Sequence, residues 1–331
     1  MTKPLKMKTL AMIGLVLFIS AAGPRPRDQI APPIQDANAL RIAVVGDYGD
    51  GSRAEADVAA LIAGWQPDYV ITVGDNNYPV GAAEDMDAVV GRYYSDYIAP
   101  YSGQFGDGAA VNRFFPTLGN HDWGTIAGDP PLPQPYLDYF TLPDGPGQER
   151  YYDVRLGPVH LFALDSDPHE PDGVSATSTQ ARWLQDGLAA SDAPWKLVVL
   201  HHAPYSSGLH GSTNYMRWPY AEWGADAVLA GHDHDYERLT VGGLPYFVNG
   251  LGGGSRYWFV IPWPGSQVRY NRDSGAMLID ATPERITFQF INRGGELIDS
   301  YEMDAAGRLA PAMSKPPRVN PFLRPSQWRV E

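Results

Sequence analysis

Short apolar runs alternate with stretches of helical spacing through most of the chain. Ala59, Ile62 and Ala63 follow the three- and four-residue intervals of a helix over 53–65, whereas 41–47 is a continuous apolar run that ends in Gly and Asp. Further helices are expected over 82–98, 179–190 and 215–223, and strands over 69–75, 114–120, 151–156, 158–165, 196–201, 226–231, 245–250, 276–281, 285–292 and 296–303. This mixture predicts an α/β fold, a sandwich of two sheets flanked by helices, rather than one doubly wound sheet.

The two ends of the chain differ from its middle. Lysines at 3, 6 and 8 precede an apolar run over 10–20 and the small residues Ala21 and Ala22. This run is well short of the ~20 residues that span a bilayer, so we expect a cleaved signal peptide, a secreted or periplasmic protein and no stable membrane anchor. The expected organisation is a signal peptide over 1–22, a Pro-rich linker over 23–40, one folded domain over 41–305 and an irregular Pro-rich tail over 306–331.

Charge and cysteine content restrict the possible chemistry. The 331 residues include 25 Lys and Arg against 38 Asp and Glu, which gives a net charge of −13. General nucleic-acid binding needs a basic face, so no nucleic-acid partner is expected. The chain has no cysteine, which excludes disulfides, thiolate ligands and a cysteine nucleophile. Any metal ion must therefore be held by oxygen donors and imidazoles. A monomer is the expected oligomeric state.

Polar motifs follow five of the predicted strands. Their side chains are Asp47 in GDYG, Asp75 and Tyr78 in GDNNY, Asn120, His121 and Asp122 in GNHD, His201 and His202 in VVLHHAP, and His232 and His234 in GHDH. Each motif alone is typical of a turn or a helix cap. Strand ends converge in α/β sheets, however, and so many polar groups buried without partners would cost several kcal/mol. A metal centre would remove that cost.

This ordered set of motifs resembles the calcineurin-like metallophosphoesterases, and within them the purple acid phosphatases, especially the small tartrate-resistant type. Two positions favour the purple acid branch. Gly49 stands where the wider superfamily has a histidine ligand, and Tyr78 stands where this branch supplies a tyrosinate. The resemblance implies the αββα metallophosphoesterase fold and two metal ions as cofactors.

The resemblance also implies a ligand for each metal ion. Fe(III) is expected at Asp47, Tyr78 and His234, and a second ion, Fe(II), Zn or Mn, at Asn120, His202 and His232, with Asp75 as the bridge. The choice between the adjacent histidines 201 and 202 rests on the family's spacing of one residue between the ligand and a proline, which selects His202 because Pro204 follows Ala203. Neighbouring strand residues point to opposite faces, so both imidazoles cannot enter the site in the same way.

Three further residues receive catalytic roles by the same resemblance. His121 is the expected acid that protonates the leaving group, Asp122 would orient or charge it, and His210 would contact the substrate phosphate. The implied function is an exported acid phosphatase that hydrolyses phosphate monoesters with a hydroxide at a dinuclear metal centre. The acidic chain favours small phosphate esters over polymers as partners. A phosphodiesterase or nucleotidase with the same centre, and a non-catalytic phosphate-binding domain, remain alternatives.

Overall fold

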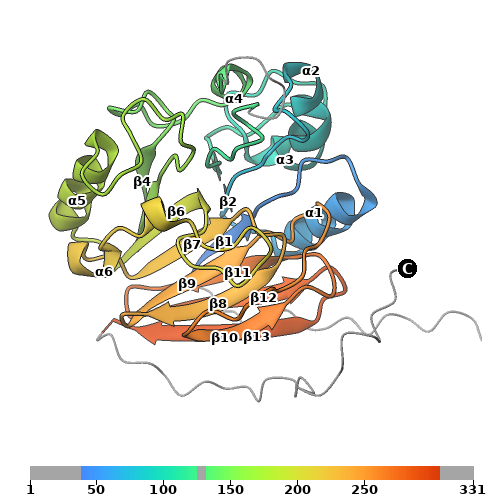
Figure 1. The fold of residues 1–331 in the computed structure, drawn as a ribbon. Coiled ribbons are helices and arrows are strands. Elements are labelled where there is room, and N and C mark those ends of the chain that lie inside the picture. Colours follow the sequence, from blue (N-terminus) through green and yellow to red (C-terminus); the bar gives the residue numbers. More distant parts are fainter. Residues whose placement is uncertain (1–38, 125–131, 306–331) are drawn as a thin grey trace, which may run out of the picture. The chain divides into compact units, whose positions relative to one another are not determined.

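The computed structural model describes residues 39–124 and 132–305, and these form two sheets with helices on their outer sides (Figure 1). The first sheet has six strands in the order β13-β12-β11-β1-β2-β3. Their bounds are Leu40–Val45 (β1), Tyr69–Thr72 (β2), Phe114–Phe115 (β3), Gly275–Ala281 (β11), Arg285–Asn292 (β12) and Leu297–Asp304 (β13). Strands β1, β2 and β3 run parallel, whereas β11 pairs with β1 in the antiparallel sense. The α/β half and the strand-rich end of the chain therefore share one sheet.

The second sheet has seven strands in the order β10-β8-β9-β7-β6-β5-β4. Their bounds are Tyr152–Leu156 (β4), Val159–Ala163 (β5), Trp195–His202 (β6), Ala227–Gly231 (β7), Tyr236–Val241 (β8), Leu244–Asn249 (β9) and Ser266–Tyr270 (β10). Strands β5, β6, β7 and β9 are parallel neighbours. Because parallel strands end at a common edge, the segments after β6 and β7 lie together.

Helices cover the outer sides of both sheets. They are α1 (Arg53–Trp65), α2 (Ala83–Met86), η1 (Asp87–Gly91), α3 (Arg92–Tyr94), η2 (Ser95–Tyr97), α4 (Gln134–Tyr139), α5 (Thr179–Ala190), η3 (Asn214–Met216) and α6 (Tyr220–Trp223). Helix α1 packs against β11, and α5 packs against α6 (Figure 1). The arrangement confirms the predicted two-sheet sandwich flanked by helices.

Three elements were not expected from the hydrophobic pattern: α4, β8 and β10. The predicted helix over 82–98 is instead a series of short turns of α, π and 3₁₀ type. The predicted helix over 215–223 is split between η3 and α6, with Pro219 at the start of the second piece. Proline lacks an N–H donor and fits the start of a helix better than its interior.

Aromatic side chains fill the space between the sheets. Phe247 of β9 stacks on Phe288 of β12 with ring centroids 4.7 Å apart, and Tyr236 of β8 stacks on Phe290 of β12 at 4.2 Å. All four side chains are buried. This core fixes one sheet against the other, so that the ends of strands from both sheets keep a constant separation.

The predicted signal peptide (1–22), most of the linker (23–38) and the tail (306–331) lie outside the described residues. Their boundaries remain predictions. No helix in the described part of the chain has the length and apolarity that crossing a membrane requires.

The start of α1 buries a carboxylate. Ser52 caps the helix by accepting a hydrogen bond from the Glu55 amide, and the Glu55 carboxylate accepts one from the Gly51 amide at 2.6 Å. Glu55 is 1% exposed, and its Oε1 has no partner among the described residues. Burial therefore raises the pKa of Glu55 to about 8.

We predict that this carboxyl group makes folding less stable as the pH rises from about 5 to about 8. In that range the folded protein holds a proton on Glu55 that the unfolded chain releases near its ordinary pKa of 4.5. The free energy of unfolding then falls by at most about 1.4 kcal/mol per pH unit. Denaturation of Glu55→Gln over this range should show a smaller fall than the wild type. The exposed Glu84→Gln variant serves as the matched control and should follow the wild type.

Candidate metal centre

Two carboxylates stand at the centre of the site, each just after a parallel strand of the six-stranded sheet. Asp47 follows β1 and Asp75 follows β2, and both are buried. Their backbones are left-handed, with φ values of 55° and 51°. Aspartate adopts this backbone conformation at some energetic cost. The conformation directs each carboxylate inward from the end of its strand. At Gly119 a side chain would collide with the Asp75 carboxylate, so glycine is needed there.

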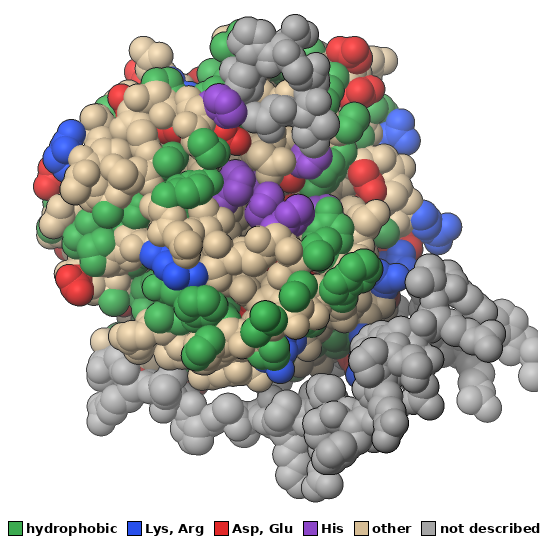
Figure 2. All heavy atoms as spheres, in the orientation of Figure 1, with side chains coloured by type: hydrophobic (Ala, Val, Ile, Leu, Met, Phe, Trp, Pro, Cys, Tyr) green, Lys and Arg blue, Asp and Glu red, His purple; other side chains and the backbone are tan. Residues whose placement is uncertain are grey.

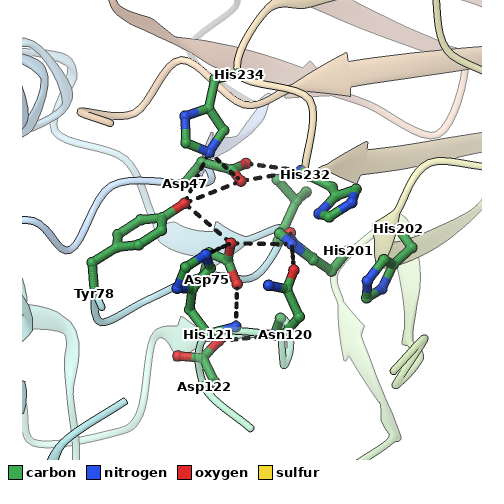
Figure 3. A network of polar contacts seen from close by, with 12 residues as sticks. Asp47, Asp75, Tyr78, Asn120, His121, Asp122, His201, His202, His232 and His234 are labelled. Carbon is green, nitrogen blue, oxygen red and sulfur yellow. Dashed lines mark hydrogen bonds and ion pairs between the residues drawn. The ribbon is translucent and has the colours of Figure 1, made fainter. Parts of the chain in front are cut away.

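Tyr78 and His234 complete a first group around these carboxylates (Figure 3). The Tyr78 hydroxyl lies 3.1 Å from Asp75 Oδ2, 3.4 Å from Asp47 Oδ1 and 3.0 Å from His234 Nε2. His234 Nε2 lies 3.4 Å from Asp47 Oδ1. The structure thus brings these four predicted ligands together, although they come from three separate segments of the chain.

A second group surrounds the other side of Asp75, and it corrects one prediction. His201, not His202, points into the centre: its Nε2 lies 3.3 Å from Asp75 Oδ2 and 3.1 Å from Asn120 Oδ1 (Figure 3). Asp47, Asp75 and His201 can place one ligand atom each within 4.8 Å of one another. His202 instead pairs its Nδ1 with the hydroxyl of Ser166 at 2.9 Å.

The reason lies in the alternation along β6. Leu197 and Val199 face the core between the sheets, and His201 lies on the same face, where its Nδ1 reaches the Val73 carbonyl. His202 turns the other way, at a point where the pairing of β6 with β7 shifts register. The opposite face also packs apolar residues, which is why the hydrophobic pattern alone did not separate the two histidines. Across the site, Gly74 leaves room for the imidazole, because a side chain there would collide with His201 Nδ1.

Hydrogen bonds fix the orientation of both inward imidazoles. His201 Nδ1 lies 2.8 Å from the Val73 carbonyl, and His234 Nδ1 contacts the Ser255 carbonyl. A carbonyl only accepts, so each Nδ1 must carry a proton, and each ring turns its Nε2 toward the carboxylates. In the neutral form of the ring this Nε2 offers a lone pair. The Tyr78 hydroxyl lies within hydrogen-bond distance of Asp47, Asp75 and His234 but carries a single proton, so several lone pairs of the cluster still face one another. This donor set fits metal ions, which is the reason that we regard the cluster as a metal centre.

Without a cation, protons would neutralise the cluster in its place. Burial alone would lower the pKa of His201, but the nearby Asp75 carboxylate outweighs it and raises the pKa to about 10. Burial, with Asp75 and Asp47 beside it, raises the pKa of the Tyr78 phenol well above its usual range. A tyrosinate at this position therefore requires a cation in contact with it.

Four histidine rings form a continuous wall beside Asn120. His232 lies 5.1 Å from His201, 4.5 Å from His202 and 4.4 Å from His210, measured between ring centroids. Burial lowers the pKa of His232 well below its usual range and that of His202 to about 3, so both rings are neutral. In the space-filling view histidines gather in a hollow with hydrophobic side chains around it (Figure 2).

The predicted catalytic residues are arranged differently from one another. The His121 amide donates to Asp75 Oδ1 at 2.9 Å, its Nδ1 contacts the Pro79 carbonyl at 2.6 Å, and its Nε2 lies 3.8 Å from Asp75 Oδ2. Asp122 points away from His121 (Figure 3). The Asp122 carboxylate accepts hydrogen bonds from Asn76 and from the Gly119 amide. The expectation that Asp122 orients or charges His121 is therefore wrong, because the carboxylate supports the backbone of two ligand loops instead.

His210 is held at the rim by the residue between two predicted ligands. Asp233 accepts hydrogen bonds from the amides of His210 at 2.7 Å and Gly211 at 3.1 Å, and from the Ser206 hydroxyl. The His210 ring is exposed and stacks on His232. These bonds fix its loop to the segment that carries the last two predicted ligands, His232 and His234.

Tyr257 is a site residue that the sequence analysis missed. Its ring stacks on His234 at 4.2 Å and meets His210 edge-on at 5.2 Å. The signal for it was weak, since Tyr257 lies in an aromatic-rich loop without any polar motif. Its nearness to the glycine-rich segment 250–254 was the one indication. At Gly254 a side chain would crowd His234, which brings this loop close to the centre.

Comparisons with known proteins agree with these features. Residues 40–236, more than half of the chain, match the family profile described as calcineurin-like phosphoesterase. Human tartrate-resistant acid phosphatase type 5 is 26% identical over 245 residues, which cover 65% of this chain and 73% of that protein. Purple acid phosphatase 17 of Arabidopsis thaliana is 25% identical over 250 residues, which cover 68% and 71%.

Solved structures share the fold. The purple acid phosphatase PPD1 from yellow lupin seeds superposes with a TM-score of 0.65 at 18% identity, over 80% of this chain and 54% of that chain. Plasmodium GAP50, described as the anchor in the inner membrane complex, superposes at 0.59 and 16% identity over 83% and 90%. The comparisons confirm the expected resemblance and the expected fold. They also confirm the predicted class of enzyme, a metallophosphoesterase. From the ordered motifs, the two-sheet architecture and the match over 40–236, the chain belongs to the calcineurin-like phosphoesterase family.

Proposed function

We propose that this protein is a metal-dependent acid phosphatase that hydrolyses phosphate monoesters. The observation that carries the proposal is the cluster of lone-pair donors around Asp75, in which the Nε2 atoms of His201 and His234 face carboxylate, phenol and amide oxygens. The relatives named above are purple and tartrate-resistant acid phosphatases, which supports the same activity.

We assign the ligands to two sets that share Asp75. The first set would hold Fe(III), because an ionised phenol is a hard anionic donor that suits this ion. The second set would hold Fe(II), Zn or Mn, and it takes His201 in place of His202. The sets are Asp47, Asp75, Tyr78 and His234, and Asp75, Asn120, His201 and His232. When bound, the two ions would polarise the phosphoryl oxygens and activate a water molecule for attack.

Charge balance suits a phosphate ester. Fe(III) and a divalent ion would bring five positive charges, and the two aspartates with an ionised Tyr78 would return three negative ones. The remaining two positive charges match a phosphate monoester dianion. Since the whole chain is acidic, with a net charge of −13, attraction of the substrate must be local.

His121 and His210 provide the protein's own contribution to the reaction. With Nδ1 donating to the Pro79 carbonyl, a protonated His121 would present its Nε2 proton to the oxygen of the leaving group. His210, exposed at the rim, would donate a hydrogen bond to the phosphate. Both roles require protonated or donating imidazoles, which favours activity on the acid side of neutrality.

Export of the protein belongs to the same proposal. The lysine-rich start, the short apolar run and the small residues at 21 and 22 are typical of a signal peptide. The mature enzyme would then act as a secreted or periplasmic phosphatase.

Purified full-length protein tests the function directly. We expect about two metal ions per chain, at least one of them iron, a visible absorption band from tyrosinate bound to Fe(III), and hydrolysis of p-nitrophenyl phosphate with a bell-shaped profile that peaks below pH 7. Bis-p-nitrophenyl phosphate, a diester, serves as the comparison substrate. A preference for the diester, or a rate that rises steadily into alkaline pH, would contradict the proposal.

Exchange of each adjacent histidine tests the ligand assignment. His201→Ala should bind about one metal ion fewer per chain and lose activity by at least about 100-fold, because it removes a donor that touches Asp75 and Asn120. His202→Ala should keep both ions. His160→Ala, whose imidazole contacts Asp153 and Ser191 instead, is the matched control. If His202→Ala lost the ion and His201→Ala kept it, the assignment would be reversed.

Leaving-group dependence tests the role of His121. Removal of a general acid slows the reaction by about 10²–10⁴-fold where the departing oxygen needs a proton. His121→Ala should therefore lose far more activity toward an alkyl phosphate than toward p-nitrophenyl phosphate, whose leaving group departs readily as an anion. Equal losses on both substrates, with metal content unchanged, would show that His121 acts in some other way.

A further inference from the structure

A cavity of about 520 Å³ lies beside the loop 206–212, which also carries His210. Leu209 and Gly211, the neighbours of His210 in the chain, both line it. The cavity wall and the His210 ring, which stacks on His232, therefore belong to the same loop. The opposite wall is the segment 260–264.

One positively charged side chain, that of Arg217, lines the cavity without a carboxylate paired with it among the described residues. The Arg217 guanidinium lies 4.8 Å from the ring centroid of Tyr205 and 4.5 Å from that of Trp263, and its Nε donates to the Pro204 carbonyl. Across 39–124 and 132–305, no carboxylate forms an ion pair with Arg217. Stacking on two rings holds the guanidinium in one orientation, with its terminal nitrogens available to a ligand.

The serines that line the cavity are already engaged within the protein. The Ser206 hydroxyl donates to Asp233, the Ser207 hydroxyl donates to Glu237, and the Ser212 hydroxyl donates to the Ser206 carbonyl. Each of these hydroxyls also accepts a hydrogen bond from a backbone amide, so none has a proton left to donate to a ligand. Arg217 is thus the charged group in the cavity wall that can select a ligand, and it selects an anion.

The rest of the wall is apolar and open to solvent. Leu209 is 44% exposed, Val260 54% and Ile261 76%. Large apolar side chains that are exposed together beside a polar site are typical of a binding surface. The segment that carries Val260 and Ile261 follows Tyr257 in the chain, and Tyr257 contacts both His234 and His210. The same stretch of chain therefore borders the metal centre and the cavity.

We propose that this cavity is the leaving-group site, and that it favours phosphate monoesters of apolar alcohols that carry a second anionic group. The inference rests on the proposed phosphatase function. With the phosphate at the metal centre, the apolar part of the ester lies along Leu209, Val260 and Ile261. The distal anion pairs with Arg217. The hydrolysis itself is unchanged: water adds to phosphorus, the P–O bond to the alcohol breaks, and the alcohol leaves with a proton.

A series of alkyl phosphates tests the proposal, because primary alcohols leave with similar intrinsic reactivity. We expect kcat/KM to be at least about tenfold higher for hexyl phosphate than for methyl phosphate, mainly through KM. A carboxylate at the end of the hexyl chain should increase kcat/KM again. The double variant Val260→Ser and Ile261→Ser should reduce the hexyl-to-methyl ratio. Arg217→Gln should lower kcat/KM for the carboxylated hexyl phosphate by about tenfold and thus abolish the advantage that the carboxylate gives. Arg217→Lys should retain part of that advantage.

Matched controls come from surface residues elsewhere. Val111 is 72% exposed and outside the cavity, so Val111→Ser should leave the hexyl-to-methyl ratio unchanged. Equal kcat/KM for all alkyl phosphates, with methyl phosphate still hydrolysed, would overturn the leaving-group site and leave the phosphatase function intact. Failure to hydrolyse any monoester would refute the function itself.

Two further outcomes would overturn the inference in favour of a macromolecular partner. One is co-sedimentation of the wild type, but not of the Ile261→Ser variant, with phosphatidylcholine vesicles. The other is a dimer in analytical ultracentrifugation that the same substitution dissociates. In either case the apolar wall would be a docking surface rather than part of a substrate site.

Discussion

Mutual repulsion among lone pairs around Asp75 is the constraint on which the rest of the structure depends. Carboxylates, a phenol, an amide oxygen and two imidazole nitrogens face one another at 3.0–3.4 Å. Such a cluster is unfavourable unless protons or a cation neutralise it. The protein holds it in place through left-handed backbones at Asp47, Asp75 and His232, and through carbonyls that fix both inward imidazoles. The cluster therefore lowers the stability of the folded protein, and the packing of the aromatic core between the sheets compensates for this loss.

The two sheets have separate tasks in building the centre. The six-stranded sheet contributes Asp47 and Asp75 at the ends of β1 and β2, and the seven-stranded sheet contributes His201 and the segment after β7. Direct bonds join them: the Asn249 side chain donates to the Val44 carbonyl, and His201 bonds to the Val73 carbonyl. A metal centre at this place would be assembled across two sheets, so its geometry would depend on their separation, which stacked aromatic side chains between the sheets help to fix.

The sequence was informative where local pattern and fold agree. Apolar runs ended by polar motifs predicted β1, β2, β3, β6 and β7, and with them six of the seven side chains that we propose as ligands. The choice of His202 failed because β6 is apolar on both faces, so only partners distant in the chain, Gly74 and Asn120, distinguish it from His201. The role of Asp122 failed for a similar reason, since its bonds to Asn76 and Gly119 depend on how three loops meet. Strand β8 was missed because its polar side chains, such as Arg238, are buried by pairing with Asp299 of β13.

Asp233 lies between His232 and His234 in the chain, and its carboxylate accepts hydrogen bonds from the loop that carries His210. Any swing of that loop outward would have to break these bonds and pull on the turn where both imidazoles originate. The opening of the active site is therefore preformed on the side of this loop. The turn over residues 232–234 sets both the width of this opening and the positions of the two imidazoles. Discrimination among esters would then arise from how well a rigid opening accommodates them, without the delay of a closing movement in each turnover.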